Sequence, residues 1–354
     1  MTDSGNLDST FSTFSLGDFP LASGATINSA SIAYKLLGPS NAPVVIYPTW
    51  FSGLISDNFY LLSPPSSVPA AISSATHRIL IPALFGNGQS TSPSNSQQRP
   101  FPAVTVADNV AAQRKLLQHL GIDKIYSVIG WSMGGMTALQ WASKFPEYFV
   151  KDTPGVVAIC ATVKCSIHNA VFLEGVKSAL LAGAAGVGSK GVGTREEVTI
   201  EEQRKVAALK AMGRVYAGWG FSQAFYREEL FKKLGFNTLE DWFTGFWEKW
   251  SLSKDVENLL CMAQTWQTAD VSAGADLPRV LAEFKVPALF LPGEQDLYFH
   301  PYDATTEASS MPMGESRPIP GVYGHWAGGP GGDPEDIRWI GDRIREVFDT
   351  TQKS

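Results

Sequence analysis

The sequence predicts an α/β fold, in which a mostly parallel β-sheet is covered by helices on both faces and interrupted by a helical insertion. Short apolar runs rich in β-branched residues alternate with helical patterns, which is typical of parallel strands buried on both faces. Between Ser166 and about Gly274 this alternation stops and the pattern becomes helical. Strand and helix patterns resume at Val286, so the helical segment interrupts the core instead of following it.

The predicted strands are short apolar runs at residues 44–47, 78–81, 125–129, 156–159 and 288–291, with a last candidate at 317–319. The clearest predicted helix spans residues 105–120. Thr105 can cap its first turn, Val106, Val110 and Leu117 recur near helical spacing, and Gly121 ends it. Its apolar face is expected to pack on the sheet.

The chain of 354 residues exceeds the usual size of a single core. We therefore assign residues 1–165 and 276–354 to the two parts of one core, and residues 166–275 to a helical lid. The lid holds five of the ten tryptophans, Trp219, Trp242, Trp247, Trp250 and Trp266. Residues 183–193 match a Gly-x-Gly-x-x-Gly pattern, but no strand precedes them, so we interpret them as a lid loop.

Composition narrows the class of protein. Hydrophobic residues make up 44% and charged residues 18% of the chain, and the net charge is −6. This is typical of a globular enzyme and gives no basic surface for binding nucleic acid. Three cysteines without Cys-x-x-Cys spacing predict neither a disulfide framework nor a metal site. The polar N-terminus and the absence of an apolar stretch of about 18 residues predict a cytoplasmic protein without membrane association.

Residues 130–134 form the most informative motif, Gly130-Trp-Ser132-Met-Gly134. A β-branched run precedes it and a helix-forming run follows it. A serine delivered by a strand into a tight turn, with a helix leaving at once, is a nucleophile elbow. Because a serine hydroxyl is a weak nucleophile, Ser132 needs a base within hydrogen-bond reach and an acid that orients the base.

In this arrangement the acid and then the histidine follow the serine along the chain. His325 lies in a glycine-flanked loop just after the last strand candidate, and we predict that it is the base. His300 is the alternative, although it lies only four residues after the best acid. The remaining three histidines precede that acid.

Asp296 is the predicted acid, since it follows the strand at 288–291 across a short turn and would face the carboxyl edge of the sheet, where ligands bind. Glu294 and Asp303 are nearby alternatives. The oxyanion of an acyl-transfer intermediate needs two donors. The backbone N–H of Met133 is one candidate, and that of Thr49 or Trp50, after the strand at 44–47, is the other.

With these residues placed, the chain resembles the homoserine O-acetyltransferase family of α/β-hydrolases. The resemblance runs from about Tyr34 to the C-terminal helix and is carried by the elbow and its helix (130–142), by Asp-Leu-Tyr-Phe-His-Pro (296–301) and by Gly-His-Trp-Ala (324–327). It implies a ping-pong mechanism in which Ser132 takes an acyl group from acyl-CoA, a cosubstrate, and passes it to an alcohol. It also implies a homodimer formed through the lid.

Two segments depart from that family. Its His-Ala-Leu-Thr-Gly segment beside the oxyanion hole is replaced by Tyr-Pro-Thr-Trp-Phe at 47–51. For the lid arginine that holds the amino acid's carboxylate, this chain offers Lys210, Ala211 or Arg214. Homoserine is therefore one candidate acceptor among several, and a less polar alcohol would suit an aromatic pocket. The candidate substrate-binding residues are Trp131, Arg214, Tyr216, Trp219, Tyr298 and Trp326.

Three functions are compatible with these residues. The first is acyl transfer, of an acetyl group in the simplest case, through an acyl-Ser132 intermediate. The second is hydrolysis of an ester or thioester by the same three residues, with water in place of the alcohol. The third is a ligand-binding protein with little turnover, because a fold does not guarantee chemistry.

Overall fold

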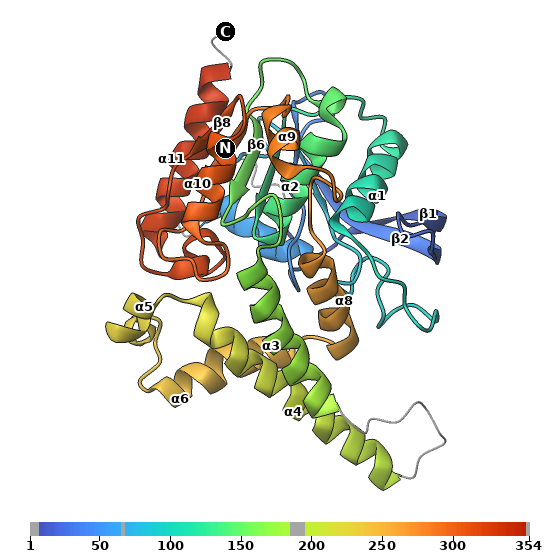
Figure 1. Ribbon diagram of the computed structural model, residues 1–354, viewed down its shortest axis with the longest axis vertical. Coiled ribbons are helices and arrows are strands. Elements are labelled where there is room, and N and C mark those ends of the chain that lie inside the picture. Colours follow the sequence, from blue (N-terminus) through green and yellow to red (C-terminus); the bar gives the residue numbers. More distant parts are fainter. Residues whose placement is uncertain (1–6, 65–67, 185–194, 352–354) are drawn as a thin grey trace.

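The central feature of the molecule is one sheet of eight strands in the order β1-β2-β4-β3-β5-β6-β7-β8 (Figure 1). The computed structural model describes residues 7–64, 68–184 and 195–351. From β3 to β8 the order is that of a parallel sheet, since the pairs β3–β5, β5–β6, β6–β7 and β7–β8 are all parallel, as is β3–β4. The predicted α/β class is confirmed. The strands are β1 (Ser12–Pro20), β2 (Thr26–Leu37), β3 (Val44–Ile46), β4 (Arg78–Pro82), β5 (Ser127–Trp131), β6 (Gly155–Ile159), β7 (Ala288–Leu291) and β8 (Gly314–Ser316).

Two features of the sheet differ from the prediction. β1 and β2 form an antiparallel hairpin that pairs with β4, and their half-exposed residues do not form the apolar runs expected of buried strands. β8 lies three residues before the predicted position at 317–319. It is an edge strand of half-exposed residues, so it carries no apolar signal, and the apolar Ile319 makes only an isolated bridge to Gly293.

The helices that flank the sheet are α1 (Val106–His119), α2 (Met133–Lys144), α9 (Leu277–Ala282), α10 (Pro301–Ser309) and α11 (Pro334–Thr351) (Figure 1). α1 begins and ends where the sequence predicts. The Thr105 hydroxyl accepts the N–H of Asp108, and Gly121 takes a positive φ of 65° directly after the C-cap. Short 3₁₀ helices span Ile55–Leu61, Pro146–Tyr148, Leu230–Lys232 and Gly324–Gly328.

The described part of the predicted lid is helical, as expected, and Figure 1 shows its helices gathered on one side of the sheet. They are α3 (Ile167–Ala184), α4 (Arg195–Gly220), α5 (Gln223–Arg227), α6 (Leu239–Trp242), a π-helix (Phe243–Glu248), α7 (Lys249–Leu252) and α8 (Val256–Gln267). Residues 185–194, most of the glycine-rich segment, lie outside the described residues. Of the helices that the structure describes, none combines the length and apolar character needed to cross a bilayer.

Candidate active site

Ser132 lies between β5 and α2 in a backbone conformation that non-glycine residues seldom adopt, with φ 56° and ψ −130°. Its N–H donates to the carbonyl oxygen of Ile159 on the neighbouring strand, at 2.9 Å. The turn is so tight that a Cβ atom on Gly130 would lie 2.1 Å from the carbonyl oxygen of Gly134. A nucleophile elbow of this kind holds the hydroxyl at the end of the strand, facing the space above the sheet.

Three side chains that are far apart in the sequence meet at this elbow. The Nε2 atom of His325 is 2.9 Å from the Ser132 Oγ, and its Nδ1 is 2.8 Å from the Asp296 Oδ2. The other carboxylate oxygen of Asp296 accepts the N–H groups of Tyr298 and Phe299, at 2.7 and 3.0 Å. Ser132, Asp296 and His325 are 3%, 1% and 2% exposed, so the chain of hydrogen bonds is shielded from solvent.

The alternatives considered from the sequence do not join this arrangement. His300 is exposed and caps α10 through its Nδ1, which accepts the N–H of Tyr302. Glu294 is exposed in the turn before Asp296, and Asp303 lies in the first turn of α10. The structure therefore brings together the serine, acid and histidine that chain order predicts.

Aromatic rings hold the His325 imidazole on two sides. Trp131 stacks on it with centroids 4.9 Å apart, and Phe299 stacks at 5.4 Å. The indole N–H of Trp131 also donates to the backbone carbonyl oxygen of His325, at 3.2 Å. Sequence reasoning named Trp131 as a substrate contact and missed Phe299, because only the folded loop shows that Phe299 faces the histidine.

A buried thiol lies behind these residues. Cys160 directly follows β6, and its Sγ lies within 4.8 Å of the ligating atoms of Asp296 and His325. Burial, reinforced by the charge of Asp296, raises the pKa of the Cys160 thiol well above its ordinary value. A cysteine binds a metal as a thiolate, which the raised pKa of Cys160 disfavours, and Asp296 and His325 already bond each other. Asp296 and His325 therefore suit proton transfer better than metal binding.

The structure partly corrects the predicted set of oxyanion donors. The N–H of Thr49 donates to the carbonyl oxygen of Pro82, at 3.1 Å, so it continues the strand pairing and is not available to a substrate. Within the described chain, the N–H groups of Trp50 and Met133 have no such acceptor. Phe51, the next residue of the same loop, also has a backbone N–H without an acceptor among the described residues.

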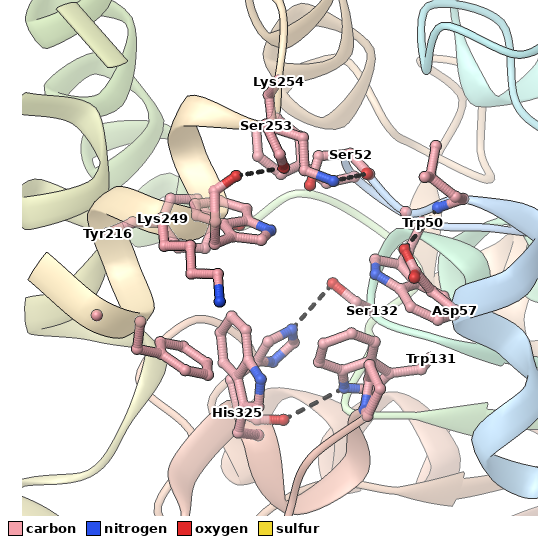
Figure 2. Close-up of a pocket in the computed structure, with 18 residues that line it drawn as sticks. Trp50, Ser52, Asp57, Trp131, Ser132, Tyr216, Lys249, Ser253, Lys254 and His325 are labelled. Carbon is pink, nitrogen blue, oxygen red and sulfur yellow. Dashed lines mark hydrogen bonds between the residues drawn. The ribbon is translucent and has the colours of Figure 1, made fainter. Parts of the chain in front are cut away.

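A cavity of about 560 Å³ opens directly above Ser132 and His325 (Figure 2). Of the six residues predicted to bind substrate, Trp131, Tyr216 and Trp326 line it. The remaining walls come from the loop after β3, which the sequence placed beside the oxyanion, and from the segment around α7, which the sequence did not place at the site. These additional lining residues include Trp50, Phe51, Asp57, Phe246, Lys249, Trp250 and Lys254.

The other three predicted substrate contacts do not line this cavity. Arg214 is exposed and forms ion pairs with Glu240 and Glu248, the latter at 2.7 Å. Trp219 packs on Phe172 and His168, within the lid. Tyr298 is buried and donates its hydroxyl to the carbonyl oxygen of Tyr216, at 2.9 Å. Helical periodicity did not determine which face of α4 turns toward the cavity, and this is why the prediction failed for Arg214 and Trp219.

The fold and the site define an enzyme of the α/β-hydrolase superfamily with a serine-hydrolase type of centre. Comparison with known proteins agrees, because residues 42–174 match the α/β-hydrolase fold family. The expected likeness to homoserine O-acetyltransferases is confirmed as well. The enzyme of that name from Trichormus variabilis is 25% identical over 325 residues, which cover 87% of this chain and 86% of that protein.

Esterases are more similar to the chain than this acetyltransferase is. A probable esterase of Corynebacterium glutamicum is 28% identical, and an ethyl acetate hydrolase of Pseudomonas veronii is 29% identical, each covering 89% of both chains. Among solved structures, the acetyl esterase MekB has a TM-score of 0.85 at 26% identity and covers 96% of this chain and 97% of its own.

Proposed function

We propose that the chain is a serine-dependent esterase that hydrolyses esters of small acyl groups, with acetyl esters as the first candidates. The observation that carries the proposal is the continuous hydrogen bonding from Ser132 Oγ through His325 to Asp296, at 2.9 and 2.8 Å. The acetyl group is inferred from the names of the similar proteins, an ethyl acetate hydrolase and an acetyl esterase.

Each group in the site has a definite task in this proposal. As Ser132 Oγ attacks the ester carbonyl, His325 Nε2 accepts its proton, and the Asp296 carboxylate stabilises the imidazolium. The N–H groups of Met133 and Trp50 would donate to the oxyanion. The bond to the alcohol oxygen then breaks, and the alcohol leaves with the proton from His325. Water, deprotonated by His325, hydrolyses the acyl-serine and restores the free enzyme.

Acyl transfer from acyl-CoA to an alcohol, the leading hypothesis from the sequence, becomes the second candidate. The likeness to a homoserine O-acetyltransferase across 87% of the chain supports it. The position of Arg214 weakens it for homoserine, because a guanidinium paired with two glutamates outside the cavity is not placed to hold the acceptor's carboxylate.

One experiment separates these functions. The purified protein is mixed with ethyl acetate or an aryl acetate, and separately with acetyl-CoA and a panel of alcohols that includes homoserine. Intact mass spectrometry records acetyl-serine, and product analysis records acetate or the new ester. We expect acetate from the simple esters at a rate that the alcohols do not change.

Ser132→Ala should abolish both the acetyl-enzyme and turnover, with a loss of at least about 10⁴-fold in kcat. Ser143→Ala is the matched control. Its hydroxyl lies on the same helix, α2, and donates to the carbonyl oxygen of Val271, away from the cavity. Efficient transfer to an alcohol with little acetate released would establish the second candidate instead.

A further inference from the structure

The cavity is lined by more basic than acidic side chains. Apart from His325, the acidic and basic side chains of its lining are Asp57, Lys249 and Lys254. Asp57 accepts the N–H of Leu54, at 2.8 Å, and caps the helix Ile55–Leu61. Lys254 donates to the carbonyl oxygen of Ser52, at 3.1 Å, and its burial lowers the pKa of its ammonium group. Both groups are therefore engaged by the cavity wall itself.

Lys249 is different. Within the described ranges it forms no ion pair and no side-chain hydrogen bond. The acid next to it in sequence, Glu248, is buried and already bonds Arg214 and Lys210, so it does not neutralise Lys249. Figure 2 shows the Lys249 side chain reaching from the lid into the cavity, while Asp57 lies on the opposite side of the opening.

The surroundings of this ammonium group are aromatic. Tyr216 lies beside Lys249 in Figure 2, and Phe246, Trp250 and Trp326 line the same cavity, as do Ser132 and His325. A cation beside apolar walls, with no protein anion to pair with, favours a ligand that brings its own negative charge. The cavity of about 560 Å³ also has room for more than an ethyl group beyond the reacting carbonyl.

We propose that Lys249 selects acetyl esters whose alcohol portion carries a carboxylate beyond an apolar or aromatic spacer. This inference rests on the proposed esterase function. Ser132 Oγ attacks the acetyl carbonyl, the bond to the alcohol oxygen breaks, and the hydroxy acid leaves with the proton from His325. Water then converts acetyl-Ser132 to acetate. Throughout, Lys249 pairs with the carboxylate of the alcohol portion and takes no part in proton transfer.

The test compares two esters that differ only in charge: the acetate ester of para-(hydroxymethyl)benzoate and its para-carboxamide analogue. Their binding is measured by titration calorimetry on Ser132→Ala protein, in which the esters stay intact. We expect the carboxylate ester to bind about tenfold more tightly, a modest factor because Lys249 is exposed to solvent. Adding Lys249→Met should reduce the preference to about twofold or less, whereas Lys249→Arg should retain it.

Lys232→Met on the same background is the matched control, since Lys232 pairs with Glu229 on the lid surface and does not line the cavity. It should leave the preference intact. Equal binding of the two esters, no binding of either, or a preference that survives Lys249→Met would each overturn the inference. Hydrolysis of the carboxamide ester by the unmodified enzyme tests the esterase function separately, so that either idea can fail alone.

Discussion

Contacts with four residues fix the orientation of the His325 imidazole. Its Nδ1 faces Asp296, its Nε2 faces Ser132, and the rings of Trp131 and Phe299 prevent it from tilting. The carboxylate of Asp296 is itself fixed by two backbone N–H groups. The tautomer with the proton on Nδ1 is therefore imposed by the fold, which leaves Nε2 free to accept the serine proton.

Replacing Asp296 by asparagine tests this tautomer. The amide oxygen would still accept the N–H groups of Tyr298 and Phe299, and the NH₂ group would then face His325 and place the histidine proton on Nε2. We expect kcat to fall about 10³- to 10⁴-fold while KM changes little, as measured by ester hydrolysis. The midpoint of thermal unfolding should move only slightly. A variant that keeps a tenth of the kcat would mean that Asp296 does not orient the base.

At the scale of the elements, the close approach between β5 and α2 determines where Ser132 stands. A Cβ atom on Gly130 would meet the backbone of Gly134 and Gly135 at 2.1 to 2.5 Å, and backbone cannot move aside as a side chain can. We expect Gly130→Ala to lower the free energy of unfolding by at least about 2 kcal/mol in urea titrations. Gly218→Ala is the control, because nothing lies within 4 Å of the added methyl group. Equal stability of Gly130→Ala and the parent would show that the elbow is not tight.

A second element-scale prediction concerns the contact between α10 and the segment after β6. Glu307 on α10 accepts the N–H of Val163, at 2.9 Å, and its burial raises the pKa of the carboxyl from 4.5 to about 8. The folded state thus binds a proton that the unfolded state releases between these values. Stability should be fully present below about pH 4.5 and fall as the pH rises toward 8.

Glu307→Gln removes this charge and keeps an oxygen that can accept from Val163. The variant should match the parent near pH 5 and exceed it by about 1 to 4 kcal/mol near pH 9, as measured by urea unfolding. The exposed Glu228 provides the control, since Glu228→Gln should show the same pH dependence as the parent. A stability gap that is constant with pH would contradict the assignment to Glu307.

The elements also show how far the sequence predicts the structure. β7, α1 and the elbow were predictable because each has a strong local signal: an apolar run, a cap with a terminal glycine, and a glycine-bounded serine. Chain order then selected Asp296 and His325. The loop after β3 was not predictable at the same level, since whether the N–H of Thr49 or of Trp50 is free depends on the exact end of pairing with β4. Lys249 and Trp250 were missed because no local pattern marks which residues of the lid helices line the cavity.

At the scale of the whole molecule, the lid and the sheet share one hydrophobic core. Phe172 on α3 contacts Tyr216 on α4, Trp266 on α8 and Tyr298 in the acid loop, with ring centroids 4.5 to 6.1 Å apart. Trp266 in turn stacks on Phe299, which stacks on His325. The aromatic contacts therefore run without interruption from the lid helices to His325, and Tyr216, which lines the cavity, is part of what holds the two portions together.

This continuity predicts a single cooperative unfolding transition. Fluorescence of the ten tryptophans and far-ultraviolet circular dichroism should give coincident urea curves. Phe172→Ala, which empties a site only 2% exposed, should lower the free energy of unfolding by about 3 to 5 kcal/mol. Because the core is shared, hydrogen exchange should show the amides of β5 and β6 losing protection by the same amount as those of α3. If the lid were energetically separate, Phe172→Ala would expose α3 and α4 to exchange, leave β5 and β6 as protected as before, and split the unfolding curve into two steps.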